Sequence, residues 1–436
     1  MPSSLLPVRA ALAGCVLALF AACATHPGAT SSPREVPVLR VGTSGDYPPF
    51  TSMRDGQVSG FDAALLESYA AERGYRLEWV RFQWPELLAD LGAHRFDMAA
   101  SGLTLRPERS LAGRYTVPVA RNGALLLLRR PAWAPAPGST PETPLALLQA
   151  LDRPEFRLAV NQGGHLERVA RAHFQHARIL AIPGNAVREA LAAGQADAAL
   201  TNTVEGPRWA EGLSGIERVG PFTRDVVALY VDASKAELAA ELDAWLLRQE
   251  ASGALERLRA SYLGSAATGP TATPVDALLS STAERLALMP MVAMAKRRAN
   301  LPTEVPAQEA RVLEAARQEV HQAAAALGVP APPDAAITAF FQAQMDAAKQ
   351  VQLRTPISAD APVHSLDEEL RPALARISAR ISALVPRVPG GLDRDSLRRK
   401  AREDLASTGL EGGEIDRLAD ALVDLGAAPR APAESR

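Results

Sequence analysis

The stretch Ala283-Glu284-Arg285-Leu286 through Met294-Ala295-Lys296-Arg297 decides how the C-terminal part of this sequence is interpreted. Apolar residues recur there at helical spacing, which predicts one long helix with a buried stripe, kinked at Pro290. Arg285 and Lys296 lie about three helical turns apart, so both cations project from the face that turns toward this stripe. Either the two cations surround an anion, because burying unpaired charge is costly, or both side chains reach past the core to solvent.

Two further segments extend this pattern along the chain. A second helix is predicted through Phe340 to Gln352, and a third opens at Leu370-Arg371-Pro372. In order and spacing, these segments resemble the all-helical chorismate mutases of the exported class over about residues 276–390. Such enzymes rearrange chorismate to prephenate without a cofactor, base or nucleophile. Their site folds a flexible dicarboxylate and stabilises the negative charge that develops on its ether oxygen.

The resemblance implies a role for each polar residue of this half. Arg285 and Arg371 are expected to bind the two carboxylates, while Lys296 and Gln352 donate hydrogen bonds to the ether oxygen. Unlike a glutamate, the amide at position 352 is a donor at every accessible pH. Three candidate substrate contacts lie on a helix between Lys296 and the predicted second helix: Gln308, Glu309 and Arg311. Gln308 stands where the family has a further arginine, and Arg311 is a candidate substitute for that arginine.

The bulk composition bounds the remaining possibilities. A chain of 436 residues is expected to form two or three domains. The formal net charge is −2 and 22% of the residues are charged, so no overall field recruits nucleic acid. Any anion binding is therefore expected to be local.

The first 37 residues predict export to the periplasm. Arg9 precedes an almost wholly apolar run from Ala10 to Ala24, which is too short to span a bilayer and is typical of a signal peptide. Cleavage is expected either after Ala24 or at a lipoprotein-type site, where a lipid on Cys23 would be the chain's membrane attachment. The other cysteine, Cys15, also lies here, so no disulfide is expected in the mature domains. Thr25 to Pro37 is interpreted as a tether.

Between residues 38 and 263, strand and helix patterns alternate, which predicts a parallel sheet covered by helices. Four motifs in this region resemble, in their order, the amino-acid receptors among the periplasmic binding proteins: Gly45–Phe50, Gly60–Asp62, Phe96–Ala99 and Ser101–Arg109. The resemblance implies two α/β lobes joined by two crossing strands, expected near Ala124–Leu128 and Val226–Val231.

A ligand cleft between the lobes follows from the same resemblance. Asp46 lies in the loop after the first strand, where ligands of α/β sheets commonly bind. Thr104 and Arg109 are expected to hold a carboxylate, because a guanidinium binds it bidentately and a hydroxyl adds a third bond. The alternative for Arg109 is a surface ion pair. Gly163-Gly164-His165 opens a helix whose exposed N–H groups form an anion cradle.

Glu167, in the first turn of that helix, has two interpretations. Its charge complements the helix dipole, which needs no ligand. Alternatively, the turn resembles that of the cyclohexadienyl dehydratases, periplasmic enzymes built on the receptor fold, whose catalytic glutamate matches Glu167. A glutamic acid with a raised pKa would then protonate the hydroxide that leaves prephenate. Asn202 stands where the receptors carry an aspartate for the ligand ammonium, so selection for an α-amino acid is expected to be weakened.

We therefore expect a multidomain chain in five parts: a signal peptide (1–24), a tether (25–37), a two-lobed α/β dehydratase domain (38–263), a flexible linker (264–275) and an all-helical mutase domain (276–430). The expected substrates are chorismate and prephenate, with phenylpyruvate as product and no metal or cofactor. The competing hypothesis is a non-catalytic receptor for an anionic or amino-acid ligand, fused to a mutase.

Overall fold

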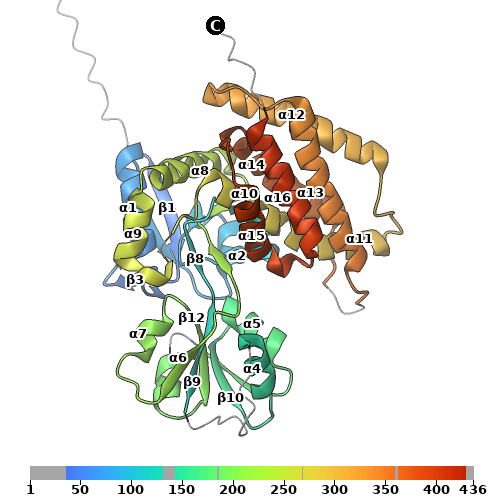
Figure 1. Ribbon diagram of the computed structural model, residues 1–436. Helices are drawn as coiled ribbons and strands as arrows, with labels where there is room; N and C mark the ends of the chain where they lie inside the picture. The colour runs from blue at the N-terminus through green and yellow to red at the C-terminus, as the bar shows by residue number, and fades with distance from the viewer. Residues whose placement is uncertain (1–35, 131–142, 184–185, 268, 359–361, 429–436) are drawn as a thin grey trace, which may run out of the picture. The chain divides into compact units, whose positions relative to one another are not determined.

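The computed structural model describes residues 36–130, 143–183, 186–267, 269–358 and 362–428 (Figure 1). Val38–Arg436 forms one compact unit. The predicted signal peptide, the candidate anchor Cys23 and most of the tether lie outside the described residues. Within the described ranges, no helix is both long enough and apolar enough to cross a bilayer.

The first lobe is built on a five-stranded sheet in the order β5-β1-β6-β15-β7. Its strands are β1 (Val38–Thr43), β5 (Arg76–Arg81), β6 (Met98–Ala99), β7 (Gly113–Tyr115) and β15 (Tyr230–Asp232). β1 runs parallel to β5 and β6, and the returning β15 is antiparallel to β6 and β7. A small sheet of β2 (Asp46–Tyr47), β3 (Thr51–Arg54) and β4 (Gln57–Ser59) follows β1 and carries the loop with Asp46.

Five helices belong to this lobe: α1 (Phe61–Arg73), α2 (Leu87–Gly92), α3 (Pro107–Ala112), α8 (Ala236–Ala251) and α9 (Ala254–Tyr262). α1 ends at Gly74, whose φ of 72° suits a residue without a Cβ. α8 and α9 are separated at Gly253, which has a φ of 71°.

The second lobe has its own five-stranded sheet, in the order β11-β10-β12-β9-β13. Its strands are β9 (Ala124–Arg129), β10 (Arg157–Asn161), β11 (Arg178–Ile182), β12 (Ala198–Asn202) and β13 (Ile216–Val219). Its helices are α4 (Pro144–Leu151), α5 (His165–His173), α6 (Val187–Ala192) and α7 (Gly206–Ala210). The carboxyl ends of β10 and β12 therefore present the glycine turn and Asn202 at the same edge of the sheet.

Two short antiparallel strands, β8 (Ala120–Asn122) and β14 (Asp225–Val227), join the lobes. The first crossing thus comes a few residues earlier than predicted, since Ala124–Leu128 already belongs to the sheet of the second lobe.

Helices are the only regular secondary structure among the described residues of the C-terminal half (Figure 1). Its α-helices are α10 (Pro274–Ala287), α11 (Met289–Arg298), α12 (Pro306–Leu327), α13 (Asp334–Arg354), α14 (Arg371–Leu384), α15 (Arg394–Asp404) and α16 (Gly412–Ala427). A π-helical turn (Leu366–Leu370) leads into α14, and a 3₁₀ turn (Val385–Arg387) follows it.

The prediction of a single long helix through Pro290 is wrong, because the structure has two helices here. The break between them lies next to the proline, where a kink was predicted. α10 ends at Ala287 and α11 begins at Met289, because Pro290 lacks an N–H and is tolerated only in the first turn of a new helix. Thr273 caps α10 by accepting a hydrogen bond from the backbone N–H of Asp276 at 3.1 Å.

The predicted flexible linker is also wrong, because its residues are packed. Ala267, Thr271 and Ala272 are buried, and the Oγ1 of Thr271 accepts a hydrogen bond of 2.8 Å from Arg259. One apolar core continues from Leu39 in the first lobe to Leu425 in α16. The two halves therefore share a core instead of being separate bodies on a tether.

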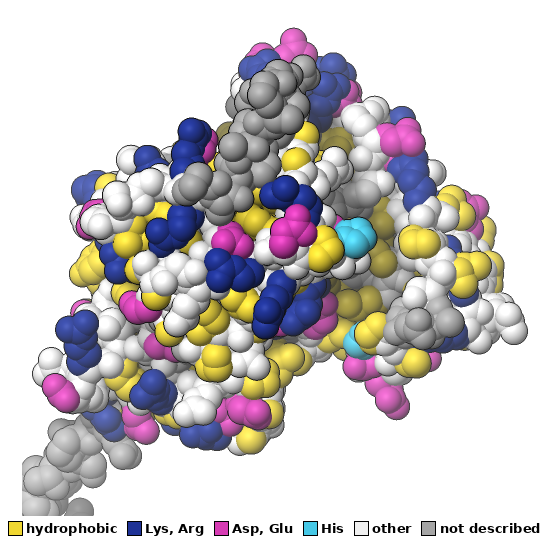
Figure 2. Space-filling view, turned by 90° about the horizontal axis from the view of Figure 1, so that it is seen from below, with side chains coloured by type: hydrophobic (Ala, Val, Ile, Leu, Met, Phe, Trp, Pro, Cys, Tyr) yellow, Lys and Arg dark blue, Asp and Glu magenta, His cyan; other side chains and the backbone are white. Residues whose placement is uncertain are grey.

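Charge is mixed on the face of the molecule that Figure 2 shows. On the face shown in Figure 2, Lys and Arg side chains are interspersed with Asp and Glu instead of forming one basic field. On this face, recognition of a charged ligand would have to come from local groups of residues.

Candidate active sites

A cleft of about 530 Å³ lies between the two lobes of the N-terminal half. It collects seven of the residues that the sequence singled out: Asp46, Thr104, Arg109, Gly163, Gly164, His165 and Asn202. Asn122 and Asp225, from the two crossing strands, also line it. The one predicted residue of this half that does not line it is Glu167.

Arg109 is buried in the cleft wall and held in place without a counter-ion. Its Nη1 donates a 3.0 Å hydrogen bond to the carbonyl of Thr104, and its guanidinium lies 5.1 Å from the centre of the Trp84 ring. No described residue forms an ion pair with it, so the alternative of a surface ion pair is excluded for this part of the chain. A buried, oriented and unpaired guanidinium is suited to binding a carboxylate.

The predicted raised pKa of Glu167 is wrong. Its Oε2 accepts a hydrogen bond of 2.6 Å from the N–H of Gly163, and its Oε1 accepts bonds of 2.9 and 2.6 Å from Arg171. The Gly163 N–H and the Arg171 guanidinium hold the pKa of Glu167 below its usual range, so this side chain is a carboxylate. One N–H of the predicted anion cradle is therefore already used by the protein itself.

His165 and Asn202 occupy the cleft with different surroundings. The Nε2 of His165 lies 3.1 Å from the Oδ1 of Asp225 on the crossing strand. Asn202 donates from Nδ2 to the hydroxyl of Tyr47 at 2.7 Å and to the Oε2 of Glu205 at 3.0 Å. The amide thus connects the cleft residue Tyr47 to a carboxyl group just behind the cleft wall.

Glu205 is a functional candidate that sequence reasoning missed. It is 2% exposed, and burial raises its pKa to about 8, so it carries a proton at neutral pH. Thr201 and Asn202 donate hydrogen bonds to its Oε2, which lowers the pKa and only partly offsets the burial. Its position three residues after Asn202, at the carboxyl end of β12, was the available indication in the sequence.

A second buried acid, Asp62 of the first lobe, lies directly behind the cleft lining. Asp62 accepts a 2.7 Å hydrogen bond from the N–H of Gly102, which lines the cleft, and its Oδ1 has no hydrogen-bond partner. Burial raises the pKa of Asp62 to about 7. The motif around Asp62 was recognised in the sequence, but its charge state was not.

In the helical half, Arg285 is directed into the packed interior. Its Nη1 donates to the carbonyl of Gln344 on α13 at 3.2 Å, and burial lowers its pKa to about 10, which leaves it charged at neutral pH. No carboxylate among the described residues pairs with it. The expectation that this cation turns toward the core and needs an anion is consistent with this placement.

Lys296, Glu309 and Arg371 lie close enough to influence one another. Lys296 donates to the carbonyl of Thr303 at 2.8 Å, and its pKa is lowered by burial and by Arg371, against the opposing effect of Glu309. Arg371 forms an ion pair with Asp367 one turn earlier, and half of its side chain is exposed. The structure therefore brings these predicted residues from α11, α12 and α14 into one electrostatic group.

Gln352 is buried on α13 with unused hydrogen-bonding capacity. Its Nε2 donates to the carbonyl of Ala348 at 3.2 Å and to the sulfur of Met289 at 3.5 Å, while its Oε1 has no partner. A buried amide oxygen without a partner is unusual in a folded protein, so Gln352 can still form a hydrogen bond to a ligand.

Gln308 and Arg311 face the exposed side of α12. Arg311 donates to the Oε1 of Gln308 at 2.8 Å, and both residues are exposed. Glu309 instead forms an ion pair with Lys349, whose Nζ lies 3.0 Å from the Oε2 of Glu309. Of the three candidates on this helix, Glu309 alone is linked to Lys296 by the interactions described above.

Comparisons with known proteins agree with this arrangement. Residues 39–265 match the model of the bacterial extracellular solute-binding proteins, family 3, and residues 276–353 match that of chorismate mutase type II. The chain is 30% identical over 268 residues to a cyclohexadienyl dehydratase of Pseudomonas aeruginosa, an alignment that covers 60% of this chain and 96% of that protein. It is 25% identical over 237 residues to the L-arginine-binding protein of the same species, covering 51% and 87%.

Among solved structures, an ancestral amino acid-binding protein, described as a precursor of cyclohexadienyl dehydratase, is 26% identical. The match covers 52% of this chain and 95% of that one, with a TM-score of 0.46. The two family models confirm the predicted fold class, a two-lobed binding-protein fold followed by a helical chorismate mutase segment. The chain belongs to the bacterial extracellular solute-binding proteins, family 3.

Proposed function

We propose that this chain is an exported bifunctional enzyme that converts chorismate to prephenate and prephenate to phenylpyruvate, on the route to phenylalanine. The observation that carries the second activity is a cleft lined by the buried Arg109, which forms no ion pair with a described residue, and by Asn202, behind which lies the buried, protonated Glu205. The likeness to a cyclohexadienyl dehydratase over nearly all of that protein, and the chorismate mutase match in the helical half, support the combination.

In the mutase step, the protein supplies position and charge. Arg285 and Arg371 bind the two carboxylates of chorismate, which holds the flexible molecule in the conformer that rearranges. Lys296 and Gln352 donate to the ether oxygen as its bond to the ring breaks and negative charge develops there. Burial lowers the pKa of Lys296, and a bound dianion opposes that effect, so the lysine is charged when substrate is present.

In the dehydratase step, one proton is consumed. The ring carboxylate of prephenate leaves as CO2, the electrons of its C–C bond make the ring aromatic, and the ring hydroxyl leaves with the added proton as water. Arg109 binds the side-chain carboxylate that remains in phenylpyruvate. Closure of the lobes excludes water and keeps these charges in a medium of low dielectric.

We propose Glu205, not the predicted Glu167, as the proton donor. A general acid has to hold a proton near neutral pH, which burial ensures for Glu205 and which the partners of Glu167 oppose. Asn202 donates from Nδ2 both to Glu205 and to Tyr47, so its amide joins this acid to the cleft lining. Glu167 then orders the glycine turn by accepting the N–H of Gly163.

Three variants of the full chain separate these assignments, with prephenate as substrate and phenylpyruvate as the measured product. Glu205→Gln should lower kcat by at least a hundredfold, because an amide cannot give up the proton. Glu167→Gln should retain most activity. Arg171→Gln, which removes only the partner of Glu167, serves as the control for disturbance of the turn. Loss of activity in Glu167→Gln with a normal Glu205→Gln would reverse the assignment.

Substrate preference, domain limits and location complete the proposal. Asn202 cannot neutralise an ammonium, so prephenate is preferred over arogenate, its amino analogue.

The dehydratase part comprises residues 38–263 and the mutase part 276–430. Export to the periplasm follows from the apolar run in the first 24 residues, and fractionation of cells that produce the full chain tests it. A purified chain that binds an amino acid tightly and turns over neither substrate would instead be a receptor.

A further inference from the structure

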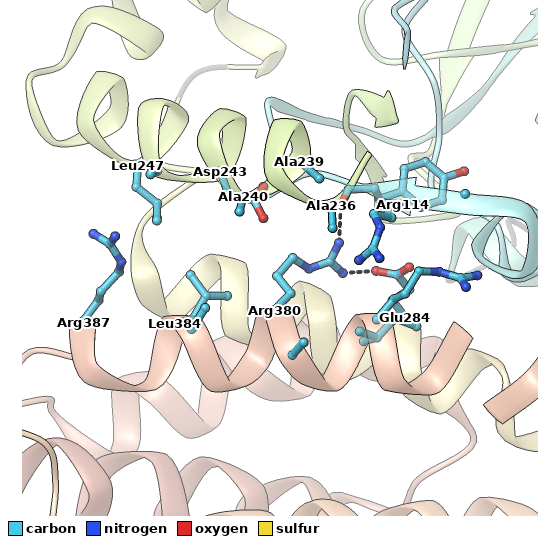
Figure 3. Close-up of a pocket in the computed structure, with 17 residues that line it drawn as sticks. Arg114, Ala236, Ala239, Ala240, Asp243, Leu247, Glu284, Arg380, Leu384 and Arg387 are labelled. Atoms are coloured by element: carbon cyan, nitrogen blue, oxygen red, sulfur yellow. Dashed lines mark hydrogen bonds and ion pairs between the residues drawn. The ribbon is translucent and has the colours of Figure 1, made fainter. Parts of the chain in front are cut away.

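A second cavity, of about 280 Å³, lies where α8 of the binding-protein half faces α14 of the helical half (Figure 3). It shares no lining residue with the cleft between the lobes. Much of its wall is apolar and comes from both helices: Ala236, Ala239, Ala240 and Leu247 of α8, and Ile377 and Leu384 of α14.

The charged residues of this cavity are mostly cationic. Arg114, Arg376, Arg380 and Arg387 line it, against two carboxyl groups, Asp243 and Glu284. In Figure 3, Arg114 and Arg380 lie beside Glu284 at one end, and Arg387 lies at the other end.

Both carboxyl groups already have hydrogen-bond or ion-pair partners within the protein. Glu284 accepts a 2.7 Å hydrogen bond from the hydroxyl of Ser110 and pairs with Arg380. Asp243 accepts a 2.7 Å hydrogen bond from the N–H of Val117. Burial raises the pKa of Asp243 to about 6, so its charge is weakened in mildly acidic conditions.

Two guanidinium groups at the Glu284 end therefore lack a counter-ion. Arg114 donates from Nε to the carbonyl of Ala233 at 2.8 Å, and Arg376 donates to the carbonyls of Ser110 and Leu111. Neither forms an ion pair with a described residue, and the Nε of Arg376 is buried without a partner. Leaving such charges unpaired in a partly buried site is unfavourable.

The arginines also repel one another. The pKa of Arg114 is lowered by burial and by Arg380. The pKa of Arg376 is lowered by burial and by Arg114, an effect that Tyr230 and Glu284 oppose only in part. An anion placed among them would offset this repulsion, since a nearby opposite charge favours the protonated form.

We propose that this cavity binds a small carboxylate with an apolar, ring-sized body, with the carboxylate at Arg114 and Arg376 and the body between α8 and α14. A guanidinium pair matches a carboxylate, and the alanine-lined wall matches a hydrocarbon ring but gives nothing to a bare inorganic anion. The ligand would touch both halves of the chain, so it stabilises their docking. The site stands independently of the proposed enzyme activities.

The test is calorimetric titration of the full chain with phenylpyruvate, which has a carboxylate and a ring, with pyruvate, which lacks the ring, and with inorganic phosphate. The chain carries Arg109→Gln, so that binding in the cleft between the lobes is weakened. Phenylpyruvate should still bind at one site per chain, at least tenfold more tightly than pyruvate, and phosphate should not compete with it.

Two substitutions locate that binding. Arg114→Gln removes a guanidinium, and Ala240→Phe fills the apolar part without changing charge; each should weaken phenylpyruvate at least tenfold in the Arg109→Gln chain. Arg248→Gln, an exposed arginine of α8 outside the cavity, should have no effect. Without the Arg109→Gln substitution, the Arg114→Gln chain should keep both turnovers and its circular dichroism spectrum. The proposal is overturned if Arg109→Gln abolishes all binding, if Arg114→Gln leaves it unchanged, or if phosphate and pyruvate bind as well as phenylpyruvate.

Discussion

Asp404→Asn should destabilise the whole molecule, because Asp404 joins the last turn of α15 to β8 and to Arg224, the residue that precedes β14. Its carboxylate accepts two hydrogen bonds of 3.0 Å from Arg121, a residue of β8, which pairs with β14. It also accepts one hydrogen bond of 2.8 Å from Arg224. Lys400 adds an ion pair at 3.3 Å. A carboxylate at a helix C-terminus is disfavoured by the helix dipole, so these cations account for its position.

The size of the effect follows from burial. The Asp404 side chain is 2% exposed, and removing one partner of a buried ion pair costs about 3–5 kcal/mol. Asp276 remains 3.7 Å from Arg121 and 2.5 Å from Lys400, so it compensates part of the loss. We expect a loss of about 3 kcal/mol in the free energy of unfolding, at the lower end of that range.

The neighbouring residue supplies a matched control. Glu403 pairs with the same Arg224 at 2.9 Å, but its side chain is 59% exposed, so Glu403→Gln should cost at most about 1 kcal/mol. Unfolding in urea is followed by tryptophan fluorescence and by circular dichroism. All five tryptophans precede residue 246, so fluorescence reports the binding-protein half, while circular dichroism also reports the helical half. Equal free energies for the two variants would refute the role given to Asp404, and a shift in only one signal would refute the shared core.

Four further outcomes are expected. The kcat/KM for prephenate should be level below about pH 8 and fall above it, because the raised pKa of Glu205 keeps its proton up to that pH. The free energy of unfolding of Glu205→Gln should increase relative to that of the parent as pH rises from about 4.5 to 8, because over this range the folded parent binds a proton that the unfolded chain releases. A difference in free energy that stays constant across this range would contradict the assignment. Arg109→Lys should lower kcat/KM for prephenate by about 10- to 100-fold, since a lysine cannot bind a carboxylate bidentately, and should leave mutase turnover of chorismate unchanged. Gln352→Glu should make mutase activity fall as pH rises while the parent stays nearly level from mildly acid to mildly alkaline conditions, because only a protonated glutamate donates to the ether oxygen; parallel profiles would remove Gln352 from the site.

The positions of the cleft residues could be predicted from motif order. Thr104, Arg109 and the glycine turn at Gly163 follow strands whose carboxyl ends meet at the cleft, so identifying the strands also located the residues. Charge states could not be predicted in the same way. The pairing of Glu167 with Arg171 at the i, i+4 positions was visible in the sequence, but the burial of Glu205 depends on packing behind β12.

The contact between the halves was beyond sequence reasoning altogether. A linker rich in small and polar residues predicts flexibility, yet Thr271 and Ala272 are buried against α8 and α9, where Ala272 donates to Glu250 at 3.1 Å. The hydrogen bonds from Arg121 to Asp404 join residues 283 positions apart, and neither residue belongs to a recognisable motif. Such contacts come from the docking of two surfaces, for which no local pattern exists.

Giving chorismate to the purified full chain and following chorismate, prephenate and phenylpyruvate over time tests the proposed pair of activities most directly. We predict that prephenate rises and then falls while phenylpyruvate accumulates to the amount of chorismate consumed, and that the Glu205→Gln chain stops at prephenate. Unchanged chorismate, or prephenate that accumulates without further conversion in the parent chain, would contradict the proposed bifunctional enzyme.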